Sequence, residues 1–336
     1  MSPPLLDQRA RPLRDLRISV IDRCNFRCPY CMPVERFGGP SAFMPKGDWL
    51  APEEIERIAR VFVALGVRKL RLTGGEPLLR AELCDIVERL ARIDGVEDLA
   101  LTTNAVLLPR HAHALRKAGL HRLTISLDAL DPAVFLRMSG GQGDVQAVLD
   151  GVASAEDAGF TRIKFNCVVQ RGINEDEVLP LVERFRGTPH VLRFIEYMDV
   201  GTCNRWSRAE VVDSAELLRR IETRWPMTPI GRAQRGEVAE RYRFEDGQGE
   251  VGFISSVSAP FCGDCTRARI SADGELFTCL FAARGVPLRP LLDGDDDALR
   301  QAIAARWSSR ADRYSELRAE REREAAGRVE MFRMGG

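Results

Sequence analysis

Short β-rich runs and amphipathic helical patterns alternate along the chain from residue 16 to about residue 196. The β-rich runs lie at 16–21, 68–72, 97–103, 122–128, 162–169 and 191–197, and the helical patterns at 52–66, 79–93, 110–120, 144–158 and 174–186. Strands that alternate with helices form parallel βαβ units with right-handed crossovers. The pattern therefore predicts a curved α/β sheet, either doubly wound or a barrel.

The alternation stops after about residue 200. A helical pattern at 215–225 precedes two expected antiparallel hairpins, the second with an Asp273-Gly274 turn, and a charged helical segment is expected at 295–325. We place a domain boundary between residues 205 and 206. The interpretation is a β/α unit at 1–205 that is capped by an α+β region at 206–336.

Composition limits the partners of the chain. Lysine plus arginine equals aspartate plus glutamate at 49 each among 336 residues, so bulk attraction to nucleic acid or to a membrane surface is not expected. No apolar run reaches the roughly 20 residues of a membrane span, and the first residues lack the apolar core of a secretory signal. We expect a cytoplasmic protein, in which the nine cysteines serve metal binding or catalysis rather than disulfides.

Three cysteines follow the first β-rich run with the spacing C-x3-C-x2-C: Cys24, Cys28 and Cys31. Pro29 and Pro33 predict a loop here. No histidine precedes His111, and no fourth cysteine lies near. A four-iron, four-sulfur cluster with one open iron uses three thiolates fully, and the open iron can chelate an amine and a carboxylate. A structural zinc site remains an alternative.

A glycine-rich turn, RLTGGEPLL, follows the second β-rich run. Gly74 and Gly75 permit close approach of the backbone to a ligand. Glu76 is placed to accept a hydrogen bond from a ligand ammonium group. Taken alone, the turn is also an ordinary connection between a strand and a helix.

A second cysteine triad has the spacing C-x2-C-x13-C and comprises Cys262, Cys265 and Cys279. Again no histidine lies within reach, which weakens the zinc interpretation and favours a second open cluster that anchors substrate. Arg267 and Arg269 alternate beside it and share one face of a strand, either toward an anionic ligand or on a solvated edge. The remaining cysteines, Cys84, Cys167 and Cys203, are isolated and are interpreted as small buried hydrophobes.

Positive side chains recur on the β-rich runs. Lys69 and Arg71 point to one side, opposite Leu70 and Leu72, and the other strand cations are Arg17, Lys164 and Arg193. Each is consistent with an exposed strand end. If the strands surround one cavity, however, the cluster requires a polyanion such as a nucleoside triphosphate, because isolated buried cations are costly. No P-loop motif is present.

With these motifs in this order, the sequence resembles the radical S-adenosylmethionine superfamily. Nearly the whole chain resembles its GTP 3′,8-cyclase family of molybdenum cofactor biosynthesis, through RPLRDLRISVIDRCNFRCPYCMP, RLTGGEPLLR, LTTN, ISLDALD, RFIEYMDVG, FCGDCTRARIS and the final Gly-Gly. The resemblance implies an incomplete barrel of six β/α units. The C-terminal region would close its open side and carry a second cluster.

The resemblance also assigns residues. It implies two [4Fe-4S] clusters on the two triads, and it assigns S-adenosylmethionine to Tyr30, Gly74, Gly75, Glu76, Ser126 and Met198. The residues implied for GTP are Arg17, Lys69, Arg71, Thr102, Lys164, Arg193, Arg267 and Arg269. Catalytic importance is implied for Arg17, Arg267, Arg269 and a terminal tail of Gly335 and Gly336, although disorder is common at chain ends.

The implied reaction begins with reductive cleavage of S-adenosylmethionine to methionine and a 5′-deoxyadenosyl radical. That radical takes hydrogen from C3′ of GTP, and C3′ then bonds to guanine C8. Implied partners are an external electron donor and the next enzyme, cyclic pyranopterin monophosphate synthase, with the chain as a monomer or homodimer. Two alternatives remain: another radical S-adenosylmethionine enzyme with an auxiliary cluster, and a non-catalytic iron–sulfur electron-transfer protein.

Overall fold

Six parallel strands confirm the predicted sheet. The computed structural model describes residues 4–39, 42–232, 236–318 and 328–335. Each of these strands pairs with the next one along the chain. They are β1 (Asp15–Ser19), β2 (Lys69–Thr73), β3 (Asp98–Thr103), β4 (Arg122–Ser126), β5 (Lys164–Val169) and β6 (Val191–Glu196).

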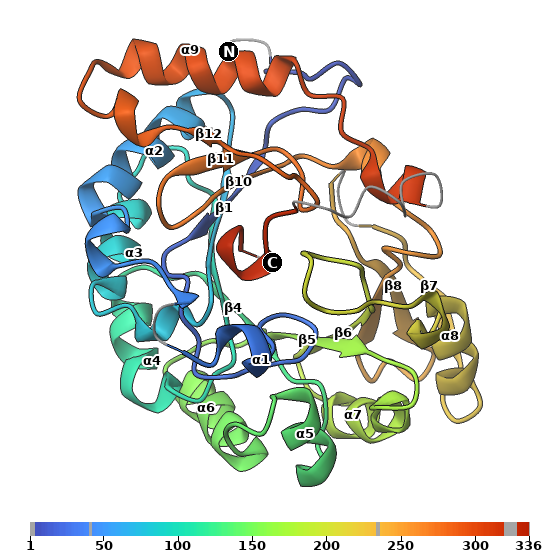
Figure 1. Cartoon of the computed structure of the whole chain (residues 1–336). Helices are drawn as coiled ribbons and strands as arrows, with labels where there is room; N and C mark the ends of the chain where they lie inside the picture. The colour runs from blue at the N-terminus through green and yellow to red at the C-terminus, as the bar shows by residue number, and fades with distance from the viewer. Residues whose placement is uncertain (1–3, 40–41, 233–235, 319–327, 336) are drawn as a thin grey trace.

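The connecting helices lie along the outer side of the curved sheet (Figure 1). They are α2 (Pro52–Ala64), α3 (Leu83–Ala91), α4 (Leu108–Lys117), α6 (Val145–Asp157) and α7 (Val178–Phe185). Because the strand order is sequential and the crossovers keep one hand, the helices fall on one side of the sheet. This arrangement excludes the doubly wound alternative, in which helices cover both faces.

The local sequence explains where these elements begin and which side they bury. Pro52 occupies the first turn of α2, and the carboxylate of Glu54 accepts a hydrogen bond from the backbone N–H of Ala51 at 2.6 Å. On β2, Leu70 and Leu72 are fully buried in the hydrophobic core, whereas the intervening cationic positions are only partly buried. The predicted alternation of this strand is thereby confirmed.

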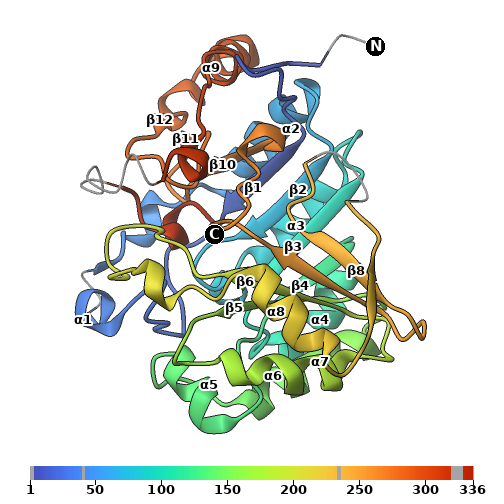
Figure 2. The same cartoon turned by 90° about the vertical axis from the view of Figure 1, so that its right-hand side faces the viewer.

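The C-terminal region adds strands to both edges of the same sheet (Figure 2). β10 (Arg267–Ile270) runs parallel to β1, and β9 (Glu250–Ile254) runs parallel to β6. Beyond them, β11 (Glu275–Phe277) and β8 (Glu240–Phe244) confirm the two predicted antiparallel hairpins, which β12 (Val286–Pro287) and β7 (Met227–Pro229) extend. The parallel pairings at the edges were not evident in the sequence.

Several helix predictions need correction. The expected 295–325 helix is α9 (Asp296–Ser308), and a 3-10 helix at Tyr314–Leu317 follows after a break; residues 319–327 lie outside the described ranges. Three further helices lie in or near the loops: α1 (Val34–Phe37) and α5 (Pro132–Met138), which were not predicted, and α8 (Ser214–Glu222), which was. Within the described ranges, each helix is too short or too polar to cross a bilayer.

The packing of β5 on α7 gives a stability prediction. The rings of Phe165 and Phe185 stack with centroids 4.0 Å apart, and Phe165 is fully buried. Phe165→Ala should lower the free energy of unfolding by about 3–5 kcal/mol, because it removes buried surface and leaves a cavity. Urea unfolding followed by circular dichroism measures the change. Leu136→Ala, at a side chain that is 42% exposed, is the control, and equal stability of the two variants would contradict the prediction.

Candidate functional site

The inner side of the sheet surrounds a cavity of about 610 Å³. Its wall combines side chains from β1 to β6, the loop after β1, and the C-terminal region. Both cysteine triads border this one cavity. In Figure 1 the C-terminal tail lies at the middle of the ring of strands and helices.

The first triad lies in the predicted loop after β1. The backbone N–H of Cys31 donates to the Cys28 carbonyl at 2.9 Å, and the N–H of Phe26 donates to the sulfur of Cys24 at 3.3 Å. Burial raises the pKa of the Cys24 thiol to about 12. Burial also raises the pKa values of Cys28 and Cys31, and repulsion among the three thiolates adds to the effect. Three neighbouring thiolates in this apolar setting require a cationic partner to share.

Residues expected around a cofactor lie beside this loop. The Tyr30 hydroxyl donates to Asp128 at 2.7 Å, which fixes the orientation of its ring. Glu76 is buried, and it already accepts hydrogen bonds from the Thr103 hydroxyl at 2.7 Å and from the Asn104 N–H at 2.7 Å. Burial nevertheless raises the pKa of Glu76 to about 7. Gly74, Gly75, Ser126 and Met198 border the same part of the cavity wall.

The second triad lies in a different electrostatic setting. Cys262 begins a 3-10 turn (Cys262–Asp264) before β10, Cys265 directly follows this turn, and Cys279 follows β11. Burial raises the pKa of Cys279 to about 12. For Cys265 burial also opposes the thiolate, yet the charges of Arg267 and Arg310 outweigh it and lower the pKa to about 6. The two arginines thus favour the thiolate form of this cysteine.

The predicted cations converge on the cavity. Among the described residues, twelve Arg or Lys side chains line it, against seven Asp or Glu. The Arg71 guanidinium donates to the hydroxyls of Thr102 at 3.1 Å and Thr124 at 2.9 Å, while the Lys69 ammonium lies 3.8 Å from Asp15. Burial, reinforced by neighbouring cations, lowers the pKa of Arg71 to about 10, of Arg193 to about 9 and of Lys164 to about 7. A bound polyanion would offset the mutual repulsion of these buried cations and favour their charged forms.

The C-terminal tail enters the site. The carbonyl oxygen of Gly335 accepts hydrogen bonds from the guanidinium groups of Arg17, at 3.5 Å, and Arg269. Phe332 and Met334 are buried, and Gly335 has a left-handed φ of 67°. Gly336 lies outside the described residues. The tail therefore contacts two of the arginines that the sequence selected.

The structure brings together nearly all of the predicted site residues. Every one of them that the structure describes borders the cavity except Gly335, which the cavity-lining arginines bind; Gly336 is not among the described residues. Sequence reasoning missed Asp128 and Arg310; Asp128 stands within the quoted ISLDALD motif, whereas nothing in the sequence marks Arg310. Cys167 is buried as expected, but Cys203 is only half-buried and its sulfur lies 3.9 Å from the Cys31 carbonyl.

Among the described residues, no group of three or more His, Cys, Asp or Glu side chains is arranged around a point that one ion could occupy. All six cysteines of the triads are among these residues.

Two family profiles and a solved structure resemble this chain. The profile of the Radical SAM superfamily matches residues 18–185, and that of Molybdenum Cofactor Synthesis C matches residues 190–316. The crystal structure of Streptococcus suis SuiB bound to S-adenosylmethionine resembles the fold with a TM-score of 0.57 at 16% identity. That match covers 80% of this chain and 60% of SuiB, and it bears on the fold alone.

Relatives at much higher identity cover almost the entire chain. A GTP 3′,8-cyclase of Xanthomonas campestris pv. campestris is 59% identical over 99% of this chain and 98% of its own length. A GTP 3′,8-cyclase of Acidothermus cellulolyticus is 53% identical over 95% of this chain and 90% of its own length. With both triads and the strand cations around one cavity, the chain belongs to the GTP 3′,8-cyclase family of the radical S-adenosylmethionine superfamily.

Proposed function

We propose that the chain is a GTP 3′,8-cyclase. It converts GTP to (8S)-3′,8-cyclo-7,8-dihydroguanosine 5′-triphosphate, with release of 5′-deoxyadenosine and methionine, in the first step of molybdenum cofactor biosynthesis. The observation that carries the proposal is that two cysteine triads and a set of strand cations face one cavity. A radical source and a triphosphate site can thus act on one substrate.

Each triad fits a [4Fe-4S] cluster with one open iron. The fit rests on the donor set: each triad supplies three thiols to the cavity, and a cluster held by three thiolates keeps one iron open. Cys24, Cys28 and Cys31 would hold one cluster, and Cys262, Cys265 and Cys279 the other. When bound, the first cluster would supply the electron that cleaves S-adenosylmethionine.

The chain itself orients the cofactor and the substrate. Tyr30, held by Asp128, and the wall formed by Gly74, Gly75, Glu76, Ser126 and Met198 are the proposed S-adenosylmethionine contacts. Because Glu76 accepts bonds from the backbone after β3, it also fixes the position of this wall. Enclosure by both halves of the chain keeps water away from the radical.

The strand cations would bind the triphosphate of GTP. The proposed contacts are Arg17, Lys69, Arg71, Thr102, Lys164, Arg193, Arg267 and Arg269. Thr102 acts partly through Arg71, because its hydroxyl accepts a hydrogen bond from the Arg71 guanidinium at 3.1 Å. The tail carbonyl of Gly335 on Arg17 and Arg269 would hold these guanidiniums near the substrate. Gly336 would extend the same tail.

The proposal includes partners. An external one-electron donor is required for cofactor cleavage, and the next enzyme of the pathway, cyclic pyranopterin monophosphate synthase, would take the product. We propose a monomer or a homodimer as the assembly. The peptide-modifying alternative and the electron-transfer alternative are both outcomes of the experiment that follows.

Anaerobic reconstitution tests the function directly. The chain is loaded with iron and sulfide and then incubated with S-adenosylmethionine, dithionite and GTP. We expect about eight irons per chain, and 5′-deoxyadenosine whose formation depends on GTP and is matched by a cyclised nucleotide product. Iron near four per chain would contradict the second cluster. Equal 5′-deoxyadenosine without GTP, and no nucleotide product, would contradict the GTP assignment.

Gly75 provides a local test of the first cluster site. A Cβ atom at this position would lie 2.0 Å from the carbonyl oxygen of Arg23, directly before Cys24. Gly75→Ala should displace the first triad and lower the iron content toward about four per chain, since the second triad is untouched. Gly47→Ala is the control, because among the described residues no atom outside its chain neighbours lies within 4 Å of its Cβ position. Full iron content and activity in Gly75→Ala would refute this packing argument.

Lys164 provides a pH test of the triphosphate site. Its pKa is lowered to about 7 in the free protein, and a bound polyanion would raise it. Binding should therefore take up a proton above pH 7, and GTP affinity should fall as pH rises from 7.5 to 9, above the phosphate pKa of about 6. Calorimetry in buffers of different ionisation enthalpy measures the uptake. Lys164→Gln should remove most of the uptake near pH 7.5, where Arg193 with a pKa of about 9 contributes little, whereas Lys117→Gln should not. Identical uptake in both variants would exclude Lys164 as its source.

A further inference from the structure

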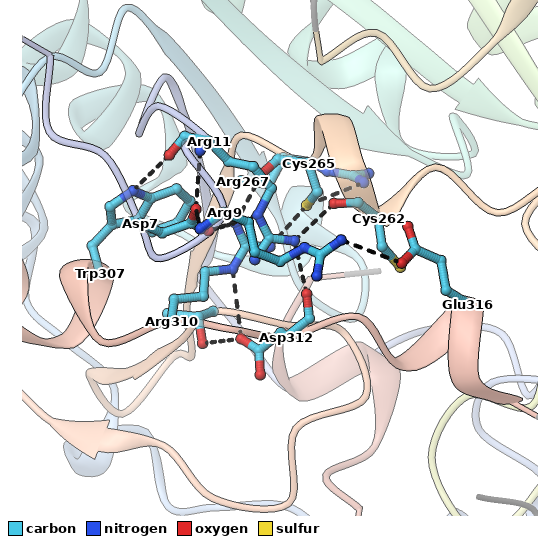
Figure 3. Close-up of polar contacts among 11 residues, drawn as sticks. Asp7, Arg9, Arg11, Cys262, Cys265, Arg267, Trp307, Arg310, Asp312 and Glu316 are labelled. Carbon is cyan, nitrogen blue, oxygen red and sulfur yellow. Dashed lines mark hydrogen bonds and ion pairs between the residues drawn. The ribbon is translucent and has the colours of Figure 1, made fainter. Parts of the chain in front are cut away.

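A buried arginine outside the predicted site contacts a ligand of the second triad (Figure 3). Arg310, just beyond α9, is 3% exposed. Its Nη2 donates to the sulfur of Cys265 at 3.1 Å, and its Nη1 donates to the Cys265 carbonyl at 2.8 Å. The guanidinium also stacks over Trp307, 4.6 Å from the ring centroid. Two donors and a stacking partner hold this side chain in one orientation.

A second buried arginine anchors the same region. Arg11 pairs with Asp7 at 2.6 Å, and both side chains are fully buried. Its Nη1 donates to the carbonyls of Cys262 at 2.7 Å and Asp312 at 2.7 Å. Arg310 reaches the same Asp7 carboxylate at 3.3 Å. This network ties the N-terminal segment, the second-triad loop and the segment after α9 into one unit.

Arg11, Arg267 and Arg310 bring three positive charges to this network, whereas Asp7 and Asp312 bring two negative ones. Arg11 and Arg310 share one fully buried carboxylate, Asp7, while Asp312 is 34% exposed and lies 3.5 Å from Nε of Arg310. A buried cation without a counter-charge is strongly unfavourable. The thiolate of Cys265, which Arg267 also approaches at 3.6 Å, supplies the missing negative charge.

The first triad has no equivalent arrangement. Within the described part of the chain, no arginine donates a hydrogen bond to the sulfur of Cys24, Cys28 or Cys31; the sulfur of Cys24 accepts from a backbone N–H instead. Hydrogen bonds and positive charge at a ligating sulfur stabilise the reduced form of an iron–sulfur cluster. The two cluster sites therefore differ in the property that sets their potentials.

We propose that Arg310 is a positioning residue that raises the reduction potential of the second cluster above that of the first, by donating a charged hydrogen bond to the Cys265 thiolate. The inference rests on the proposed function only in requiring the second cluster. The first cluster, beside the proposed S-adenosylmethionine contacts, would then be the stronger reductant and would deliver the electron. The second cluster, on the substrate side, would be the weaker reductant.

A redox titration of the full chain tests this role. The anaerobically reconstituted protein, without S-adenosylmethionine or GTP, is titrated with dithionite and followed by electron paramagnetic resonance. We expect two one-electron waves, and the chain with Cys24, Cys28 and Cys31 changed to Ser should retain only the one at higher potential. Arg310→Met should lower the midpoint potential of that wave by at least about 59 mV. This shift corresponds to a factor of about ten in the equilibrium constant of the one-electron reduction.

Two further variants separate charge from structure. Arg310→Lys keeps the positive charge and should give a smaller shift than Arg310→Met, while Arg313→Met should give none, since Arg313 pairs with Glu316. An unshifted wave in Arg310→Met with full iron content would overturn the role of Arg310. If Arg310→Met loses iron, the same criterion applies to Arg310→Lys. Wild-type protein with about four irons per chain would instead refute the proposed second cluster.

Discussion

The two open edges of the six-stranded parallel sheet are the constraint on which the rest of this structure depends. An edge strand exposes unpaired backbone N–H and C=O groups, and natural sheets cover or pair such edges. Here β10 pairs with β1 and β9 pairs with β6, so one C-terminal region satisfies both edges. The same pairing brings the second cysteine triad to the cavity that the first triad borders.

Electrostatics follows from this enclosure. Strand cations that would be solvated on an open sheet become buried once the C-terminal region covers them, and burial lowers the pKa values of Arg71, Lys164 and Arg193. The register sets Arg17 of β1 directly beside Arg269 of β10. The tail carbonyl of Gly335 accepts hydrogen bonds from both arginines and so partly offsets their mutual repulsion. An anionic substrate would neutralise the remaining positive charge, and this is the physical basis for proposing a triphosphate ligand.

The two triads show how similar sets of cysteines acquire different properties. Both supply three thiols to one cavity, yet the first lies in a loop whose burial raises the pKa values of its thiols, whereas Cys265 faces two arginines that lower its pKa to about 6. Sequence spacing describes the ligands alone. The surrounding charges come from Arg267 next to the triad and from Arg310, 45 positions away along the chain.

The sequence by itself determined the repeated β/α units, the two triads, the alternation of Lys69 and Arg71 and the two hairpins, because these depend on local periodicity and spacing. It could not determine that β10 pairs with β1 and β9 with β6, where the helix after residue 295 ends, or that Arg310 contacts Cys265. Only the tertiary structure decided these features. Strand pairing across long loops and the sharing of counter-charges depend on which surfaces are buried together, and no local pattern encodes that information.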